Sequence, residues 1–177
     1  MRAGLISESP VRPRIPFHAV NRCGRPGYRP GLQRHHLLPR ELLGATSFGH
    51  LFETLGVQHV GFDDFRRNGL LLPCEERSAV RMGLPLHRGP HRAYNELVRE
   101  RIGQIERDWS HDGRSAPSQA RNCALMRLWL LQRALRRRLL ATARPLRLNR
   151  YDPLGAKRDF SELDRMAEIL WRDTAPA

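Results

Sequence analysis

Apolar residues recur at helical spacing in a short stretch near residue 50 and in two longer stretches of the second half of the chain. The short stretch is closed by Gly56, a residue type typical of the position after a helix ends. Its apolar positions are Phe48, Leu51, Phe52 and Leu55. Because residues three and four apart share one face of a helix, the pattern predicts a short amphipathic helix from about Ser47.

A long amphipathic helix is predicted to begin at the dipeptide Gly89-Pro90 and to end at about Trp109. Glycine is accepted as an N-cap, and proline is favoured at the first helical position. The helix carries a partly apolar stripe, made of Ala93, Leu97, Ile102 and Ile105. The polar segment 110–118 then interrupts the periodicity, so the helix is expected to stop there.

A second long helix is predicted from about Gln119 to about Ala141. One side of it carries Leu125, Leu128, Trp129, Gln132, Leu135 and Leu139. The rest of its surface carries Arg127, Arg133, Arg137 and Arg138. These arginines fit either the solvated face of a helix packed on the core or a surface that binds phosphate, and the pattern leaves both open. Further along, Ser161 is expected to cap a short final helix.

Two short strands are expected to form the only sheet. The stretch "NGLLLP" is a turn dipeptide followed by three leucines, and it predicts a buried strand from Leu70 to Leu72 that is closed by Pro73. Its expected partner lies around His36 to Leu38. Residues 1–34 are rich in Pro, Gly and Arg without periodicity, which indicates an extended basic arm.

The element pattern indicates a mostly helical α+β fold. A chain of 177 residues suffices for one domain with a real core but not for two domains of ordinary size. We therefore expect a basic arm over residues 1–30, a central domain over residues 31–110, and an Arg-rich helical segment over residues 118–177 that packs on the core.

The chain is strongly basic, with 31 Lys and Arg residues against 18 Asp and Glu residues and a net charge of +13. Such a balance favours a polyanionic partner. Lys157 is the only lysine, and two explanations compete for the abundance of arginine. Arginine makes forked contacts to phosphate, but biased codon usage would also enrich it everywhere. Only the places where arginines cluster therefore count as evidence.

The three cysteines, Cys23, Cys74 and Cys123, are far apart and form no CxxC pair. They indicate neither a disulfide framework nor a cysteine-rich zinc ribbon. The N-terminus has no apolar stretch of signal-peptide length, and arginines interrupt the most apolar region, residues 124–141, too often for it to span a bilayer. We expect a cytoplasmic protein without a membrane partner.

Four of the eight histidines are expected to converge where the two strands meet the first long helix. His35 and His36 end the first strand, and His87 and His91 flank the predicted helix start in "HRGPH". Three neutral imidazoles are the number that a catalytic divalent site uses when it leaves a position open for water and substrate. The other four, His18, His50, His59 and His111, are expected to be structural or solvent-exposed.

The expected position of these histidines at a helix N-terminus has an electrostatic consequence. The partial positive charge of a helix N-terminus opposes a bound cation by up to about 1 kcal/mol at the surface. A phosphate that contacts both the metal and the helix end reverses the sign of this effect. The arrangement therefore suits a site that acts on a phosphate better than one that only stores metal.

Three separated motifs, "RHHLLP", "NGLLLP" and "LHRGPHRAYNELV", occur in this order between Arg34 and about Arg101. Together they resemble the AHH group of HNH nucleases, of the ββα-metal or His-Me finger superfamily. The resemblance implies a ββα-metal finger core with added helices. It implies that one divalent ion, Zn or Mg, is held by His35, His87 and His91. It also implies two catalytic-site residues: His36 as general base, and Asn68 as the residue that braces the loop between the strands.

The activity implied by this resemblance is metal-dependent hydrolysis of phosphodiester bonds, with His36 taking a proton from the attacking water. The partner is a nucleic acid, with DNA favoured over RNA and little sequence specificity. The expected phosphate contacts are Arg34, which replaces the alanine of the family motif, and Arg88, Arg133 and Arg137. The resemblance further suggests a bacterial toxin-type effector, delivered into a target cell by a secretion system and neutralised by an immunity protein.

Two other interpretations are kept beside the nuclease. In the first, Cys74 supplies a fourth ligand and the chain is a non-catalytic, zinc-stabilised nucleic-acid-binding module. In the second, the chain is a basic helical interaction protein that acts through residues 119–141. The first requires a closed coordination shell, and the second does not require the four histidines to converge.

Overall fold

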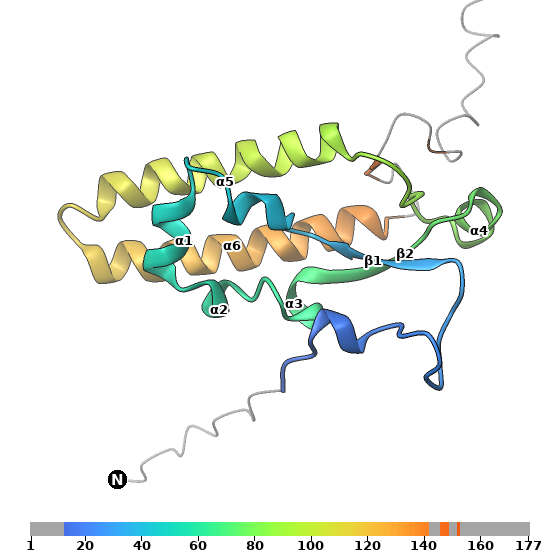
Figure 1. Cartoon of the computed structure of the whole chain (residues 1–177). Helices are drawn as coiled ribbons and strands as arrows, with labels where there is room; N and C mark the ends of the chain where they lie inside the picture. Colours follow the sequence, from blue (N-terminus) through green and yellow to red (C-terminus); the bar gives the residue numbers. More distant parts are fainter. Residues whose placement is uncertain (1–12, 142–145, 149–151, 153–177) are drawn as a thin grey trace, which may run out of the picture.

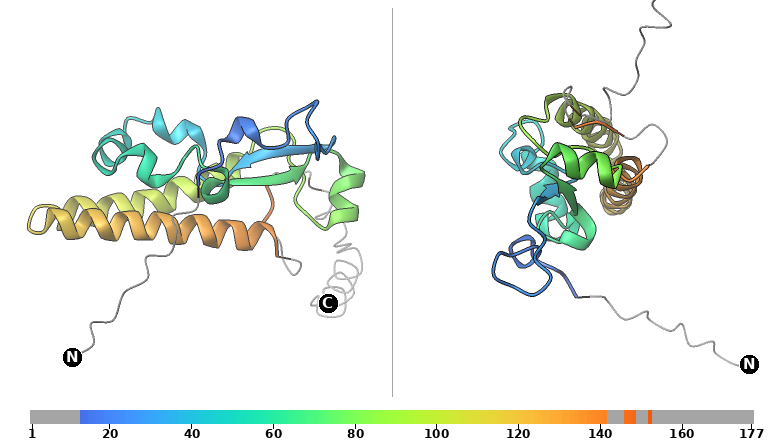
Figure 2. Two further views of the ribbon diagram at one scale, coloured as in Figure 1. Left: turned by 90° about the horizontal axis from the view of Figure 1, so that it is seen from below. Right: turned by 90° about the vertical axis from the view of Figure 1, so that its right-hand side faces the viewer.

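A computed structural model describes residues 13–141, 146–148 and 152 of the chain. The elements in this part of the chain pack in two layers (Figures 1 and 2). One layer is an antiparallel pair of long helices, α5 (Arg92–Asp112) and α6 (Pro117–Leu139). The other layer contains a two-stranded sheet and several short helices (Figures 1 and 2). The mostly helical α+β fold predicted from the sequence is confirmed. No helix in the described part of the chain is both long and apolar enough to cross a membrane.

The sheet is an antiparallel hairpin of β1 (Leu32–His36) and β2 (Gly69–Pro73), in which His36 lies opposite Gly69. The prediction of the second strand is confirmed. The first strand ends at His36, as expected from the position of the His pair, but it does not include Leu37 and Leu38, which were also expected in it. These two residues leave the ladder and enter the core, where both are fully buried. Their N–H groups instead donate to the backbone and side chain of Asn68, respectively.

Short helices fill the connections on either side of β2. They are η2 (Arg40–Leu43), α1 (Gly49–Leu55), α2 (Val57–Val60), α3 (Phe65–Asn68) and α4 (Glu76–Met82). The helix predicted near residue 50 is confirmed as α1, with Gly56 as its C-cap at φ 81°. By contrast, α4 has no counterpart among the helices predicted from the sequence.

The start of α5 corrects the predicted position. The helix begins at Arg92 with His91 as N-cap, whereas Gly89 adopts a left-handed φ of 76° before the helix. This positive φ suits a turn and is incompatible with a right-handed helical turn. The buried stripe of α5 also differs from the predicted one. It consists of Tyr94, Val98, Ile102 and Ile105, so Tyr94 and Val98 take the places predicted for Ala93 and Leu97.

Helix α6 begins with Pro117 at its first turn, two residues before the predicted start. Its buried positions are Ala120, Ala124, Leu128, Gln132, Leu135 and Leu139. The prediction that Trp129 faces the core is wrong, because this side chain is 40% exposed and lies beneath the Arg133 guanidinium at 4.7 Å. The small side chains of Ala120 and Ala124 let α6 approach α5 closely. The buried stripe of α6 includes these two alanines and excludes Trp129, so it differs from the predicted apolar side.

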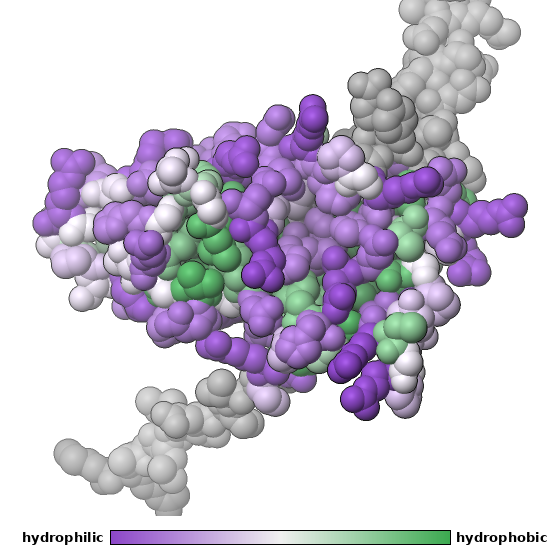
Figure 3. All heavy atoms as spheres, in the orientation of Figure 1, coloured by the Kyte–Doolittle hydropathy of each residue, from purple (hydrophilic) through white to green (hydrophobic). Residues whose placement is uncertain are grey.

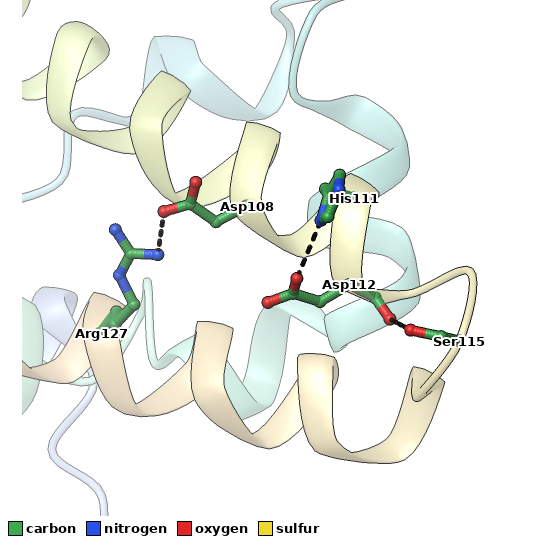
Figure 4. A network of polar contacts seen from close by, with 5 residues as sticks. All are labelled: Asp108, His111, Asp112, Ser115 and Arg127. Carbon is green, nitrogen blue, oxygen red and sulfur yellow. Dashed lines mark hydrogen bonds and ion pairs between the residues drawn. The ribbon is translucent and has the colours of Figure 1, made fainter.

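Polar contacts add little to the α5–α6 pairing compared with the buried stripe. Arg127 pairs with Asp108 across the two helices, and Ser115 donates to the carbonyl of Asp112 in the connecting turn (Figure 4). Exposed ion pairs of this kind contribute about 0–1 kcal/mol. Hydrophilic side chains cover most of the face seen in Figure 3. The apolar residues of both layers join in one core below it.

Residues before β1 contain regular structure, whereas an extended arm was predicted there. Residues 17–19 form a short 3-10 helix, η1 (Phe17–Ala19), and Phe17 is only 7% exposed. Pro16 forms an isolated antiparallel bridge with Asp64.

The expected domain boundaries stay predictions, and the final helix expected at Ser161 lies outside the described residues.

Replacing Gly69 with alanine should destabilise the fold by about 1–3 kcal/mol, the usual range for overpacking. The added Cβ would lie 2.1 Å from Cδ2 of Phe65, so the ring or the strand must shift. Gly49→Ala is the matched control, because a Cβ there meets nothing within 4 Å and alanine favours the helix. Urea unfolding of both variants measures the difference, and equal midpoints would contradict the packing argument.

Candidate metal centre and active site

Three histidines from different parts of the chain converge at the end of the hairpin. One ring nitrogen from each of His35, His87 and His91 lies within 4.8 Å of the others. The ring centroids are 5.1 Å apart for His35 and His87, 5.7 Å for His35 and His91, and 4.8 Å for His87 and His91. The predicted cluster is therefore present as a geometric arrangement.

His35 is held by its place in β1. Successive strand residues point to opposite sides, and at this position the side chain points toward α5. It is 3% exposed, and its ring contacts the edge of Tyr94 at a centroid distance of 5.0 Å. Its Nε2 atom is buried and has no hydrogen-bond partner. A buried nitrogen lone pair without a partner is unusual in a folded protein and is consistent with a metal ligand.

The segment before α5 brings the other two rings to His35. The backbone N–H of His87 donates to the carbonyl of Pro73, the last residue of β2, at 2.7 Å. This hydrogen bond fixes His87 beside the end of the strand. The left-handed turn at Gly89 then reverses the chain and returns His91 to the same side as His87. This explains why two ligands four residues apart can converge although they do not share a helix.

The nitrogens of His87 and His91 are oriented for different reasons. Nδ1 of His87 donates to Oε1 of Gln33, at 3.0 Å, which leaves its Nε2 as the acceptor nitrogen. Nδ1 of His91 is buried and has no hydrogen-bond partner. Each ring thus offers a nitrogen lone pair to a shared space.

Burial keeps the cluster neutral at physiological pH. It lowers the pKa of His35 to about 2, with further lowering by the neighbouring charges of His87 and His91. Burial also lowers the pKa of His87 to about 4, again aided by His91. For His91 the pKa is lowered by burial alone. Neutral imidazole is the form that binds a metal, so these shifts favour ligation.

The donor set fits a divalent ion with an open coordination position. Three neutral nitrogens converge, and two of them have no other partner. Among the described residues, the group that is suited to a metal includes no cysteine, so Cys74 does not complete a fourth position. The closed zinc module therefore loses its structural basis, and the convergence itself disfavours a purely helical interaction protein.

His36 lies on the other side of β1 from His35. Its ring stacks on Phe17 with centroids 3.7 Å apart and planes 3° from parallel. Nε2 of His36 is buried and has no hydrogen-bond partner. Burial lowers the pKa of His36 to about 4; Arg40 and Arg34 lower it further, and Asp63 opposes them. A neutral imidazole with a free nitrogen is suited to accept a proton.

Asn68 is fully buried and braces the hairpin. Its Oδ1 accepts from Leu38 N at 2.7 Å, and its Nδ2 donates to Leu38 O at 3.1 Å and to Phe62 O at 3.2 Å. Asn68 was expected at the catalytic site, and in the structure its side chain is buried and bonded to the connection between the two strands. Its contacts match the bracing role that the resemblance implies.

The supporting contacts of three residues were not predicted from the sequence. Gln132 of α6 donates to Oδ1 of Asn68 at 3.3 Å, and Tyr94 donates to Leu37 O at 2.7 Å. Gln33 lies two residues before His35 and holds His87. A glutamine among leucines on a buried helix face was a detectable signal for Gln132. No sequence signal indicates the partners of Tyr94 and Gln33.

The four arginines expected to bind nucleic acid have different surroundings. Arg34 donates through one guanidinium nitrogen to Phe17 O at 2.8 Å, so this part of the side chain fastens the protein backbone. Arg88 is exposed and lies 4.0 Å from Glu76 in a surface ion pair. Arg133 and Arg137 are exposed on α6, near Arg136, which donates to Arg66 O. The four other histidines, 18, 50, 59 and 111, are exposed, as expected.

A family model described as a nuclease family of the HNH/ENDO VII superfamily with conserved AHH matches residues 17–135, about two thirds of the chain. The matched span begins at Phe17 and ends in α6, so it contains every residue of the histidine cluster as well as Asn68 and Gln132. No curated protein and no solved structure matches the chain.

Without metal, the stability of the protein should fall as pH decreases from about 6.5 to about 4. The pKa values of His35, His36 and His87 lie below the value of 6.5 expected in the unfolded chain, so the unfolded state binds more protons in this window. The slope should approach about 1.4 kcal/mol per pH unit for each histidine that titrates. Urea unfolding in chelator across this range measures it, and a constant free energy of unfolding would show that the cluster is not desolvated.

Proposed function

The chain belongs to the AHH family, a nuclease family of the HNH/ENDO VII superfamily, and we propose that it hydrolyses phosphodiester bonds in DNA with one divalent metal ion. The observation that carries the proposal is the division of the His35-His36 pair between two sides of β1. His35 joins His87 and His91, whereas His36 presents a separate free nitrogen.

The proposed metal ligands are His35, His87 and His91. When bound there, a divalent ion supplies Lewis acidity that polarises the scissile phosphate and stabilises the leaving oxygen. Three imidazole nitrogens suit zinc or another transition metal better than magnesium, which prefers oxygen ligands. Gln33 fixes the ring of His87 in the orientation that frees its Nε2, and Tyr94 packs against His35.

His36 is proposed to accept the proton of the attacking water at its Nε2 atom. This nitrogen is buried without a partner, and the imidazole is neutral at physiological pH. The stack on Phe17 fixes the plane of the ring. A positioned general base of this kind contributes about 10²- to 10⁴-fold to a hydrolysis rate.

The surroundings of the site favour a phosphate. His91 is the N-cap of α5, whose N-terminal end carries partial positive charge. The charges of Arg34 and Arg40 act on His36. The net charge of +13 attracts a polyanion without reading its sequence, which supports the choice of DNA and little sequence specificity. The same charge suits an acidic immunity protein, as the toxin-type role would require.

Replacing His36 with alanine should reduce the single-turnover cleavage rate by about two to four orders of magnitude while metal binding is retained. The reason is that His36 lies outside the cluster formed by His35, His87 and His91. His35→Ala should instead lose metal affinity first and activity as a consequence. The measurements are single-turnover cleavage of plasmid DNA at saturating metal and metal content by elemental analysis.

Cys74→Ala provides the matched control for metal binding. This cysteine follows β2 but does not belong to the histidine group, so the variant should retain the metal content of the parent protein. A Cys74→Ala protein without metal would indicate a closed site and would contradict the catalytic assignment. Cleavage by His36→Ala at close to the parental rate would contradict the role of the base.

Reversing the charge at Arg133 and Arg137 should make DNA affinity less dependent on salt. If both side chains contact phosphates, the slope of log affinity against log salt should decrease by roughly 0.9 for each lost contact. Arg101→Glu with Arg107→Glu on α5 is the control, because it makes the same change in net charge at other exposed arginines. Equal slopes for the two double variants would show that only net charge matters.

A further inference from the structure

Residues 15–21, which we call the N-terminal strap, are fastened at both ends. At the first end, Phe65 N of α3 donates to Ile15 O at 2.7 Å. At the other end, Nδ2 of Asn21 donates to Leu32 O at 2.8 Å, where β1 begins. The strap is therefore tied to α3 and to β1, the strand that carries His36, although it was expected from the sequence to be part of an extended arm.

Arg34 holds the middle of the strap. Its NH1 atom donates to Phe17 O at 2.8 Å and lies 3.5 Å from Val20 O. Arg34 and His36 belong to the same strand and are two residues apart, so their side chains leave β1 on the same side. The guanidinium thus places Phe17 against the strand beside His36.

Phe17 lies between His36 and Phe65 in a continuous series of ring contacts. One face of Phe17 covers His36 in a parallel stack, with centroids 3.7 Å apart. Phe65 meets Phe17 at 73° and 5.1 Å. The ring of Phe65 in turn lies against Gly69, the residue opposite His36 in the hairpin register. Phe17 thus lies flat against the imidazole and is itself backed by Phe65, so the His36 ring cannot tilt toward the strap unless Phe17 moves.

We propose that Phe17 is a positioning residue that holds the His36 imidazole in the orientation needed to accept the proton of the attacking water. The inference rests on the proposed function, because it takes His36 as the base. It assigns to the strap a part in the reaction, although Phe17 itself offers no group that exchanges a proton. What matters is the flat face of the side chain rather than its apolar volume alone.

The test compares Phe17→Leu, which removes the flat face, with Phe17→Tyr, which keeps it. Phe17→Leu should cleave DNA roughly 10- to 100-fold more slowly in single turnover at saturating metal, as expected for a misplaced reactive group. Metal content and KM should remain at the parental values. Phe17→Tyr should recover most of the rate, a result that a purely structural role would not require.

Phe48→Leu is the matched control for lost aromatic packing. Phe48 is 6% exposed, similar to Phe17 at 7%, and its ring contact is with Phe52 in the core. It should lower the thermal unfolding temperature without a comparable loss of rate. If Phe48→Leu slows cleavage as much as Phe17→Leu at equal stability, the assignment of Phe17 is overturned.

A double-mutant cycle separates this inference from the proposed function. In the His36→Ala background, Phe17→Leu should cause no further decrease in rate, because residues that act as a unit are not additive. An equal decrease in both backgrounds would overturn the positioning role. If His36→Ala itself cleaves at close to the parental rate, the base assignment fails. If His36→Ala is slow and Phe17→Leu is not, only the inference about Phe17 fails. Should Phe17→Leu not fold, Phe17→Met is measured by the same criteria.

Discussion

The hydrogen bonds of one buried amide, Asn68, hold together the elements that carry the site. Asn68 binds both backbone groups of Leu38 and the carbonyl of Phe62, so it fixes the chain at the point where β1 ends and β2 begins. Gln132 of α6 reaches the same side-chain oxygen and connects the long-helix layer to the hairpin. A shift of either layer would break hydrogen bonds of Asn68. Each buried polar group left without a partner would then cost about 1–3 kcal/mol.

The twofold periodicity of a strand gives the side chains of two adjacent histidines different surroundings. His35 points to α5 and joins two other imidazoles, whereas His36 points to Phe17 and is influenced by Arg40, Arg34 and Asp63. Burial keeps both rings neutral, but their free nitrogens face different surroundings. A strand therefore places two adjacent imidazoles in different surroundings, as the proposed division into a metal ligand and a base requires.

Local sequence signals were sufficient for α1 and for β2, because Gly56 and "NGLLLP" act over a few residues. The histidine cluster joins residues that are far apart in the sequence, and it could be predicted because three separated motifs occur in a fitting order. The signals failed where long-range packing decides. The start of α5 depends on the left-handed turn at Gly89, and the exposure of Trp129 depends on how closely α5 and α6 approach. The strap was missed because its contacts are with residues far along the chain, and no periodic pattern records such contacts.

Under the proposed function, the composition of the cluster would make the binding of metal and of phosphate mutually dependent. Among the described residues, the proposed ligand group consists of imidazoles and includes no carboxylate, and the pKa values of His35 and His87 are lowered by burial and by neighbouring histidines. A bound dication would keep its full charge beside the N-terminus of α5 in a protein of net charge +13. A phosphate would relieve this repulsion and strengthen metal binding, and by thermodynamic linkage the metal would strengthen phosphate binding by the same factor. The excess positive charge is therefore in keeping with the proposed function, in which metal and phosphate are held together, rather than with storage of a metal alone.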